Sequence, residues 1–364
     1  MTIRIFQNAG LYRSYAPRLR QLSHGVTGFR QLLAVFMNDR FGAAHTLLPV
    51  LQEEATAFFT NGDDDTLQRA WAREHGLPGH STLEDILRAQ IESHRAEVFY
   101  NSDCMRYGND FVRKLPGCVK FSIAWRAAPS GGADFSAYDL VVSNFPVLLQ
   151  GYAARGMRTA YFFPAHDPVM DEYAANTERP VDVLFAGSYS RHHQRRARLL
   201  EAIAQLAARR NIVMHLDRSR LTRLAESPVG RLAPLGHYRR PRPIRTLAQP
   251  PVFGRELYRA LSRSRITING AIDMAGEERG NMRCWEALGC GALLVSDAGH
   301  YPEGMENGVT LMTFTDPADA VATIELALDG DERARAAAGH RMIRTLYSKE
   351  RQWSAFCKLV GDRA

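Results

Sequence analysis

The feature that most constrains the fold is an alternation of short apolar, β-rich runs with helical segments along almost the whole chain. Two neighbouring parallel strands need a crossover connection of helical length, so this alternation favours parallel sheets with helices on both faces. The sequence therefore predicts two successive sets of α/β units. The predicted strands occupy residues 3–7, 54–62, 96–103, 120–125, 139–144 and 159–164, and then residues 181–188, 212–217, 265–270, 292–295 and 309–314.

The two sets of strands are separated by residues 164–181, which contain three prolines and few apolar residues in register, a composition typical of a linker. The 364 residues are also many for one domain. We expect an N-terminal domain over residues 1–170, a C-terminal domain over 171–345 and a final helix over 346–364. Because ligands of open α/β sheets bind beyond the carboxyl ends of the strands, the cleft between the two domains is the expected site.

One helix start in the N-terminal half carries a clear local signal. The segment 81–94 opens with Ser81, and Glu84 stands three residues later. This spacing predicts a capping box, with Ser81 as the N-cap residue and Glu84 as its reciprocal partner.

The charge of the chain limits the partners that it suits. The formal net charge is +7, which favours phosphate-bearing partners. Eight arginines fall in residues 217–245, where the alternatives are a solvated loop and a contact with nucleic acid or an anionic membrane. Only one aromatic residue, Tyr238, lies in the basic part of this segment, so nucleic acid is not an expected partner.

The location of the protein is predicted from what the sequence lacks. We find no run of about 18 apolar residues and no apolar signal core at the N-terminus. The five cysteines are scattered without a C-x-x-C pair, as expected of reduced thiols. We therefore expect a cytoplasmic protein, with peripheral contact at the inner membrane face as the alternative. His192 and His193 have no partner at metal-ligand spacing, so no metal site is expected there.

The first motif with chemical meaning is "FAGSYSRHHQRR", residues 185–196. A predicted strand ends in Gly187 and Ser188, and a basic helix follows. The free backbone amides of a helix start bind anions, and glycine permits a close approach. Arg191 could add positive charge. The motif indicates a phosphate site, with a plain strand-to-helix turn as the alternative.

The second motif is "NGAIDMAGEERGNMRCWEALGCG", residues 269–291. A polar, glycine-rich loop is followed by a helix that Asn281 is expected to cap. A carboxylate in this helix that faces the cleft, Glu286, could accept two sugar hydroxyls, and the helix dipole would help to keep it ionised. The alternative is an ordinary surface ion pair between Glu286 and Arg283, three residues away.

The chain resembles the GT-B glycosyltransferases, and within them the CgeB-like, family-4-related bacterial group, over nearly its full length. The resemblance rests on "VDVLFAGSYSRHHQRRARLL", "ELYRALSRSRITINGA", "NMRCWEALGCGALLVSD" and "DERARAAAGHRMIRTLYSKERQW". It implies an α/β fold of two Rossmann-like domains that face each other across a cleft, with the C-terminal helix packing back on the N-terminal domain. It also implies a nucleotide-sugar donor in the C-terminal domain, a glycan, lipid-linked or protein acceptor in the N-terminal domain, and no cofactor or essential metal.

The resemblance also implies roles for particular residues. Family-4 enzymes bind the donor with two glutamates separated by seven residues, and Glu278 and Glu286 match this spacing. Glu286 is then expected to hold the ribose hydroxyls, and Glu278 to lie beside the sugar as a catalytic residue. Because "MAGEERG" departs from the family's usual context, Glu277 is the alternative to Glu278. The residues expected to bind the donor are Gly187, Ser188, Arg191, Asn269, Asn281, Arg283 and Glu286.

The expected reaction breaks the bond between the anomeric carbon and a nucleoside diphosphate, whose charge cations and backbone amides stabilise. A retaining enzyme needs no base of its own if the leaving phosphate takes the acceptor proton, whereas an inverting enzyme needs one from the N-terminal domain. The glutamate spacing favours retention. The candidate bases are the predicted strand-end residues Asp103 and His166 and the predicted loop residues Asp39 and His45, each with a structural role as the alternative. The residues expected on the acceptor side are Tyr12 and Asn101.

Two other functions stay open at this point. The first is a non-catalytic binding protein that has kept the fold. The second is an anionic-membrane or nucleic-acid binder that acts through residues 217–245. Carboxylates in the cleft favour the enzyme, since a scaffold has no need of them.

Overall fold

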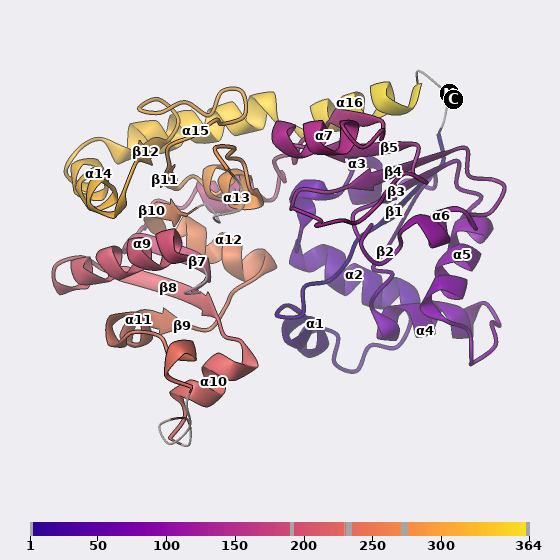
Figure 1. Cartoon of the computed structure of the whole chain (residues 1–364), viewed down its shortest axis with the longest axis horizontal. Coiled ribbons are helices and arrows are strands. Elements are labelled where there is room, and N and C mark those ends of the chain that lie inside the picture. The colour runs from indigo at the N-terminus through magenta and orange to yellow at the C-terminus, as the bar shows by residue number, and fades with distance from the viewer. Residues whose placement is uncertain (1–2, 190–192, 229, 231–234, 271–275, 362–364) are drawn as a thin grey trace. The chain divides into compact units, whose positions relative to one another are not determined.

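The computed structural model describes residues 3–189, 193–228, 230, 235–270 and 276–361 (Figure 1). The chain divides into two compact units, one formed by Met1–Ala165 together with Lys349–Ala364 and the other by His166–Ser348. Each unit holds a six-stranded sheet whose paired strands are all parallel. The predicted α/β class with parallel sheets is thus confirmed.

The sheet of the first unit has the order β2-β1-β3-β4-β5-β6. Its central strands are buried, which explains their continuous apolar runs. From β1, the chain continues to β2 on one side, whereas β3 lies on the other side, so the carboxyl ends of β1 and β3 form a topological switch point. The strands are β1 (Ile5–Asn8), β2 (Ala57–Thr60), β3 (Val98–Asn101), β4 (Phe121–Trp125), β5 (Leu140–Ser143) and β6 (Thr159–Tyr161).

The helices of the first unit confirm the predicted alternation, with one correction at a helix start. The capping box lies one residue later than predicted, because Thr82 caps the Asp85 amide and the Asp85 side chain bonds back. The Ser81 amide is used in a turn with the Pro78 carbonyl instead. The helices are α1 (Ala16–Leu22), α2 (Phe29–Asp39), α3 (Leu48–Leu51), α4 (Asp65–Glu74), α5 (Leu83–His94), α6 (Asn109–Val112), α7 (Pro146–Ala153) and the 3-10 turn η1 (Ala43–His45).

The last helix, α16 (Lys349–Gly361), packs on the first unit, as the expected fold requires (Figure 1). Lys349 is only 1% exposed, and its ammonium group donates to the carbonyl oxygens of Ala43, Ala44 and Thr46 at 2.7, 3.2 and 2.7 Å. The ring of Phe356 packs edge-on against Tyr100, 5.3 Å between centroids. A buried cation with three carbonyl partners therefore fixes the start of α16.

The sheet of the second unit has the order β12-β11-β10-β7-β8-β9, so its switch point lies between β7 and β10. The two-residue strand β9 was not predicted. The strand expected over 309–314 begins only at Met312, because the Thr310 hydroxyl closes a turn between Gly304 and Glu306. The strands are β7 (Val181–Ser188), β8 (Ile212–Asp217), β9 (Ala248–Gln249), β10 (Ser264–Asn269), β11 (Leu293–Asp297) and β12 (Met312–Phe314).

The segment expected as a linker folds as part of the second unit from His166 onward. It contains α8 (Met170–Ala174), and the half-buried Arg179 donates through its guanidinium to the carbonyls of Ser264 and Cys290. The other helices are α9 (Gln194–Gln205), α10 (Arg220–Glu226), α11 (Arg242–Leu247), α12 (Gly254–Ser262), α13 (Met282–Gly289), α14 (Pro317–Asp329) and α15 (Glu332–Leu346), with the 3-10 turns η2 (Leu206–Ala208) and η4 (Gly236–Tyr238).

Two global expectations can be compared with the structure. Within the described residues, no helix has both the length and the apolar character needed to cross a bilayer.

The five cysteines are free, and three of them are buried. Burial raises the pKa of the Cys104 and Cys284 thiols to about 12, so these two groups are protonated and unreactive at neutral pH.

Candidate active site

The carboxyl ends of β7 and β10 meet at the switch point of the second sheet. The register pairs Phe185 with Ile268, so Gly187 and Ser188 extend beyond the last paired residue of β10 and are exposed. A side chain at Gly187 would begin 3.0 Å from the Phe185 ring. Packing against this ring therefore also explains a glycine here, in addition to its predicted role at a phosphate. The predicted residue Arg191 lies outside the described residues.

The basic start of α9 is not simply solvated. The Arg195 guanidinium lies 3.2 Å from the carboxylate of Asp297, which is buried at the end of β11, and it donates to the Thr315 carbonyl. Arg196 donates to the Gly270 carbonyl just beyond β10. These two arginines therefore hold α9 against the strand ends. Part of their hydrogen-bonding capacity and charge is already used by groups of the protein.

Asn269 and Asn281 are both at this edge, as predicted, and they bond to each other. The Asn281 amide donates to Asn269 Oδ1 at 3.0 Å, and the Asn269 amide donates to Ser296 Oγ at 3.0 Å. Asn281 occupies the N-cap position of α13, but its side chain makes no cap hydrogen bond. The prediction of a side-chain cap is thus wrong, because the longer-range bond to β10 takes its place.

The loop before α13 is fixed by Arg279, a residue that was not predicted. Arg279 is 5% exposed. Its guanidinium donates to the carbonyls of Gly276, Glu278, Asp297 and Ala298. A backbone bridge joins Glu278 to His300 beside it. The only local signal was an arginine inside a glycine-rich loop, which does not reveal burial.

The structure separates the two alternative glutamates of this loop. The Glu277 side chain is 83% exposed and lies 3.9 Å from His300. Glu278 is half-buried. Glu278 is therefore the better placed of the two for a ligand at this edge, and its role stays a prediction.

Glu286 is buried in α13 and pairs with Arg283, whose Nη1 donates to Glu286 Oε2 at 2.7 Å. The predicted alternative of an ion pair is thus present, but the pair is internal, with side chains 7% and 19% exposed. Burial raises the pKa of the Glu286 carboxyl, and Arg283 opposes this shift. Arg283 Nε is buried without a hydrogen-bond partner among the described residues. A buried donor without a partner calls for an explanation, and a bound ligand is one such explanation.

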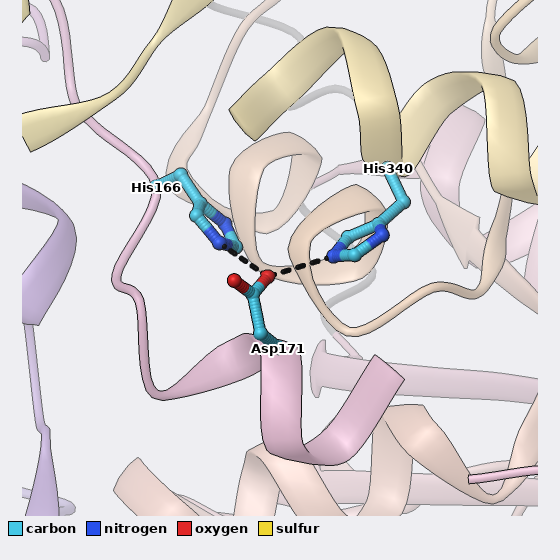
Figure 2. A group of neighbouring side chains, drawn as sticks. All are labelled: His166, Asp171 and His340. Atoms are coloured by element: carbon cyan, nitrogen blue, oxygen red, sulfur yellow. Dashed lines mark hydrogen bonds and ion pairs between the residues drawn. The ribbon is translucent and has the colours of Figure 1, made fainter. Parts of the chain in front are cut away.

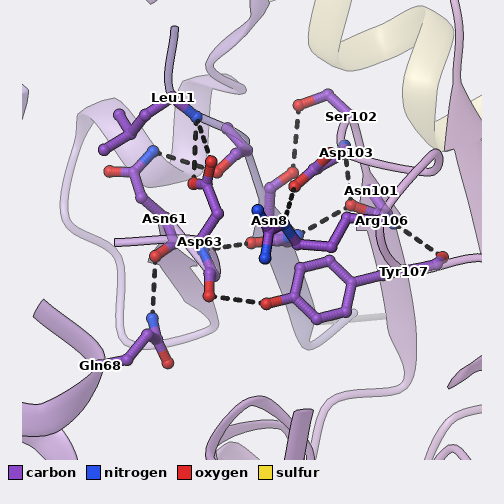
Figure 3. A network of polar contacts seen from close by, with 12 residues as sticks. Asn8, Leu11, Asn61, Asp63, Gln68, Asn101, Ser102, Asp103, Arg106 and Tyr107 are labelled. Atoms are coloured by element: carbon purple, nitrogen blue, oxygen red, sulfur yellow. Dashed lines mark hydrogen bonds and ion pairs between the residues drawn. The ribbon is translucent and has the colours of Figure 1, made fainter. Parts of the chain in front are cut away.

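The switch point of the first sheet is built by two asparagines (Figure 3). The Asn8 amide at the end of β1 donates to Asn101 Oδ1 at the end of β3, at 2.9 Å, and the Asp103 amide donates to the same oxygen at 2.9 Å. Asn101 also donates to the Tyr138 hydroxyl and is fully buried. Asn101 is therefore not available for the expected contact with an acceptor. Instead, its side chain holds the backbone of Asp103 in place.

Asp103 lies just beyond β3 with the electrostatics of a proton acceptor. Burial, and then the neighbouring Asp63, raise the pKa of its carboxyl to about 6. Asp103 Oδ2 lies 3.6 Å from Arg106 Nε and has no hydrogen-bond partner among the described residues. A side chain at Gly10 would begin 3.0 Å from Asp103 Cγ, so this glycine makes room for the carboxylate. A partly buried carboxylate that titrates near neutral pH suits general base catalysis.

A pocket of about 340 Å³ opens beside this network in the first unit. Tyr12, one of the residues expected on the acceptor side, lines it together with Asp63, Arg13, Arg20 and Arg106. The Leu11 amide donates to both oxygens of the Asp63 carboxylate, at 3.0 Å each, which holds that group at the pocket wall (Figure 3). The pocket thus combines carboxylate and guanidinium groups, both of which bind hydroxyls.

Two of the remaining base candidates have structural roles. Asp39 ends α2 and is 4% exposed, with its oxygens bound by the Arg18 guanidinium and the Tyr15 hydroxyl. His45 lies in η1 rather than on an open loop. Loss of solvent around the ring, and then the charge of Lys349, lower the pKa of His45 to about 3. Neither group is available to take a proton from an acceptor.

His166 is not placed as predicted. It follows β6 by five residues rather than ending the strand, and it belongs to the second unit. It is 4% exposed, and its Nε2 lies 2.9 Å from Asp171. The expectation of a base supplied by the N-terminal domain therefore fails for His166.

The arginine-rich segment 217–245 is partly internal. Arg240 is 5% exposed and binds both carboxylate oxygens of Glu226, at 2.6 and 2.8 Å. Arg218 lies 3.8 Å from the same carboxylate. Residues 229 and 231–234 lie outside the described part of the chain. A role of this segment at an anionic surface stays a prediction.

Comparisons with known proteins identify the fold. Residues 191–358 match the model of a family described as glycosyl transferase-like. HepE from Anabaena, in complex with UDP, is similar over 100% of both chains at 12% identity and a TM-score of 0.60. A glycosyltransferase from Rickettsia africae is similar over 99% of this chain and 98% of its own, at 11% identity and a TM-score of 0.56.

Sucrose-phosphate synthase from Thermosynechococcus elongatus is similar over 98% of both chains, at 11% identity and a TM-score of 0.54. Among curated proteins, no sequence matches the chain. The two parallel α/β units are those of the GT-B glycosyltransferase fold, which confirms the predicted fold and resemblance. The narrower CgeB-like grouping stays a prediction.

Proposed function

We propose that this chain, which has the GT-B glycosyltransferase fold, transfers a sugar from a nucleotide-sugar donor to an acceptor hydroxyl. The observation that carries the proposal is the ion pair between the half-buried Arg283 and the buried Glu286, in which Arg283 Nε has no partner among the described residues. Two further findings support it. The match to the glycosyl transferase-like family model includes Glu278 and Glu286. Solved structures of HepE hold UDP with glucose and UDP-glucose.

The donor would bind at the carboxyl edge of the second sheet. Arg283 occupies one oxygen of Glu286, and the other oxygen would accept the ribose hydroxyls. The unpaired Arg283 Nε and the exposed backbone at Gly187 and Ser188 would face the diphosphate. Glu278 would lie beside the sugar. Arg283 and the backbone amides would supply positive charge and hydrogen bonds for the leaving diphosphate, so the proposed reaction requires no metal.

In the reaction, the bond between the anomeric carbon and the diphosphate oxygen breaks, and a bond from that carbon to the acceptor oxygen forms. We favour retention, in which the acceptor proton passes to the leaving phosphate and Asp103 orients the acceptor hydroxyl. In the inverting alternative, the Asp103 carboxylate takes that proton. Glycans, lipid-linked sugars and proteins all offer hydroxyls that such a site could use.

The proposal is tested by binding and by turnover. A thermal-shift screen against UDP, GDP, dTDP and CMP sugars should yield at least one stabilising nucleotide sugar, because a ligand that binds only the folded state raises the melting temperature. That sugar is then followed for hydrolysis or transfer. The variant Glu286→Gln should show a smaller shift and a much lower turnover, whereas Glu277→Gln, at an exposed position, should keep both.

A stabilising nucleotide sugar without any hydrolysis or transfer would favour the non-catalytic binding protein instead. Full turnover by Glu286→Gln would remove the donor assignment. The stereochemistry of the product, read by NMR, decides between retention and inversion.

A further inference from the structure

Three metal-ligating side chains converge in the second unit, apart from the groups proposed for sugar transfer (Figure 2). His166 lies at the start of this unit, Asp171 in α8 and His340 in α15. Nε2 of each imidazole lies 2.9 Å from the same oxygen, Asp171 Oδ1. Figure 2 shows both rings pointing at this carboxylate from opposite sides.

The donor set and its spacing fit a divalent transition-metal ion. The three ligand atoms lie within 4.8 Å of one another. In a tetrahedral zinc site the metal–ligand bonds are about 2.0–2.2 Å, so the ligand atoms are about 3.3 Å apart. Each imidazole nitrogen must therefore move away from Asp171 Oδ1 by only a few tenths of an ångström. We propose that His166, Asp171 and His340 bind a divalent cation such as Zn²⁺, with water in the fourth position.

The surroundings of the three side chains support this assignment. Arg344 Nε lies 3.2 Å from Asp171 Oδ2, the oxygen that does not face the imidazoles. Such an outer hydrogen bond orients a ligating carboxylate. The His166 amide donates to the Tyr347 carbonyl at 2.7 Å, which fixes the backbone of this ligand to the end of α15.

The access of the site also suits a metal. The Asp171 and His340 side chains are 34% and 18% exposed, so an ion can reach them from solvent. At Gly289, any side chain would collide with Met170 Sδ and begin 3.1 Å from His166 Nδ1, so this glycine leaves space for both side chains.

A cation held here would be structural. It would link the segment that begins the second unit to α15, the last helix of that unit. Binding only to the folded chain would then raise the stability of the unit by mass action. The ion takes no part in the proposed sugar transfer, so this inference does not depend on the proposed function.

The test uses the full chain after removal of metals with a chelator. Titration with Zn²⁺ should show one strong site per chain and a rise in melting temperature of several degrees. Co²⁺ should give visible absorption bands of a tetrahedral or five-coordinate site. The variants Asp171→Asn and His340→Gln should weaken Zn²⁺ binding at least tenfold and should lose the Co²⁺ bands, whereas His80→Gln, at an exposed position, should change neither.

Circular dichroism of the metal-free variants checks that they are folded. If Asp171→Asn does not fold, the test relies on His340→Gln. Unchanged Zn²⁺ affinity in a folded His340→Gln variant would overturn the proposal. So would the absence of a strong site in the natural chain. Equal losses in His340→Gln and His80→Gln would show only scattered binding by surface histidines, which also contradicts it.

Discussion

Arg283 and Glu286 form an ion pair of 2.7 Å within one turn of α13, in which Glu286 is buried and Arg283 is half-buried. On a protein surface, such a pair at this spacing contributes a few tenths of a kcal/mol. Here Glu286 has lost its water and Arg283 most of its own, so the pair is costly unless further hydrogen bonds complete it. One hydrogen bond is missing, because Arg283 Nε has no acceptor among the described residues. In the proposed function, the nucleotide sugar supplies it.

Replacing Glu286 by Gln should lower kcat/KM for the donor by about 10–100-fold, since a hydrogen bond to a charged group is worth about 1.5–3 kcal/mol. Steady-state kinetics with the best donor of the thermal-shift screen measures this. The matched control is Glu277→Gln, which should lie within a factor of about two of the natural chain, because surface changes have small effects. Equal kinetics for Glu286→Gln and the natural chain would contradict the assignment.

Asp103 should give the activity a dependence on pH. Its pKa is raised to about 6, so the fraction of ionised carboxylate, and with it kcat/KM, should rise as the pH increases through about 6. In Asp103→Asn, this rise should disappear and the rate should fall at every pH. A rise near pH 6 that persists in the Asn variant would assign it to another group.

The same carboxyl should affect stability in a defined direction. Because the pKa of Asp103 is higher in the folded chain than in the unfolded one, the folded chain binds more protons between about pH 4 and 6. Protonation of Asp103 therefore makes its full favourable contribution to the free energy of unfolding below about pH 4, and this contribution is lost as the pH rises through about 6. Asp103→Asn should therefore raise the free energy of unfolding at pH 7, relative to the natural chain, by up to about 3 kcal/mol. Urea denaturation at pH 4 and 7 measures this, and the gain should shrink at pH 4.

Arg279 should control the order of the loop that carries Glu278. Arg279→Met leaves the carbonyls of Gly276, Glu278, Asp297 and Ala298 without their guanidinium partner. Amide exchange over residues 276–280 should become faster, and the donor KM should rise several-fold. Arg341→Met, at an exposed position of α15, is the control. Unchanged exchange in this loop would show that the backbone bridge to His300 holds it alone.

Lys349 should attach α16 to the first unit. Lys349→Met removes one donor from three carbonyls, of which those of Ala43 and Ala44 keep backbone N–H donors. The loss of the Thr46 partner should lower the free energy of unfolding by about 1–3 kcal/mol, which is the cost of one buried group left unpaired. Lys358→Met lies on the exposed side of the same helix and should change it by less than about 0.5 kcal/mol. Equal stability of the two variants would contradict this role.

Local patterns succeeded where one short stretch of sequence decides the structure. The helix start near residue 82 was predicted to within one residue, because Ser81 and Thr82 both have an acid three residues later and only the preceding turn selects Thr82. The Asn281 cap failed for the opposite reason, because its side chain has a better partner, Asn269, on another element.

The sequence by itself determined the two parallel α/β units and the strand ends at which ligands of such sheets bind. Strands that are buried on both faces must be apolar throughout, and this leaves a pattern that can be read along the chain. Only the tertiary structure decided which polar groups meet there. It placed Asp63 near Asp103, buried Arg279 under its loop, and joined His166 to His340 through Asp171. These partners are distant in sequence, and the order of the strands and the packing of the helices bring them together, which no local pattern encodes.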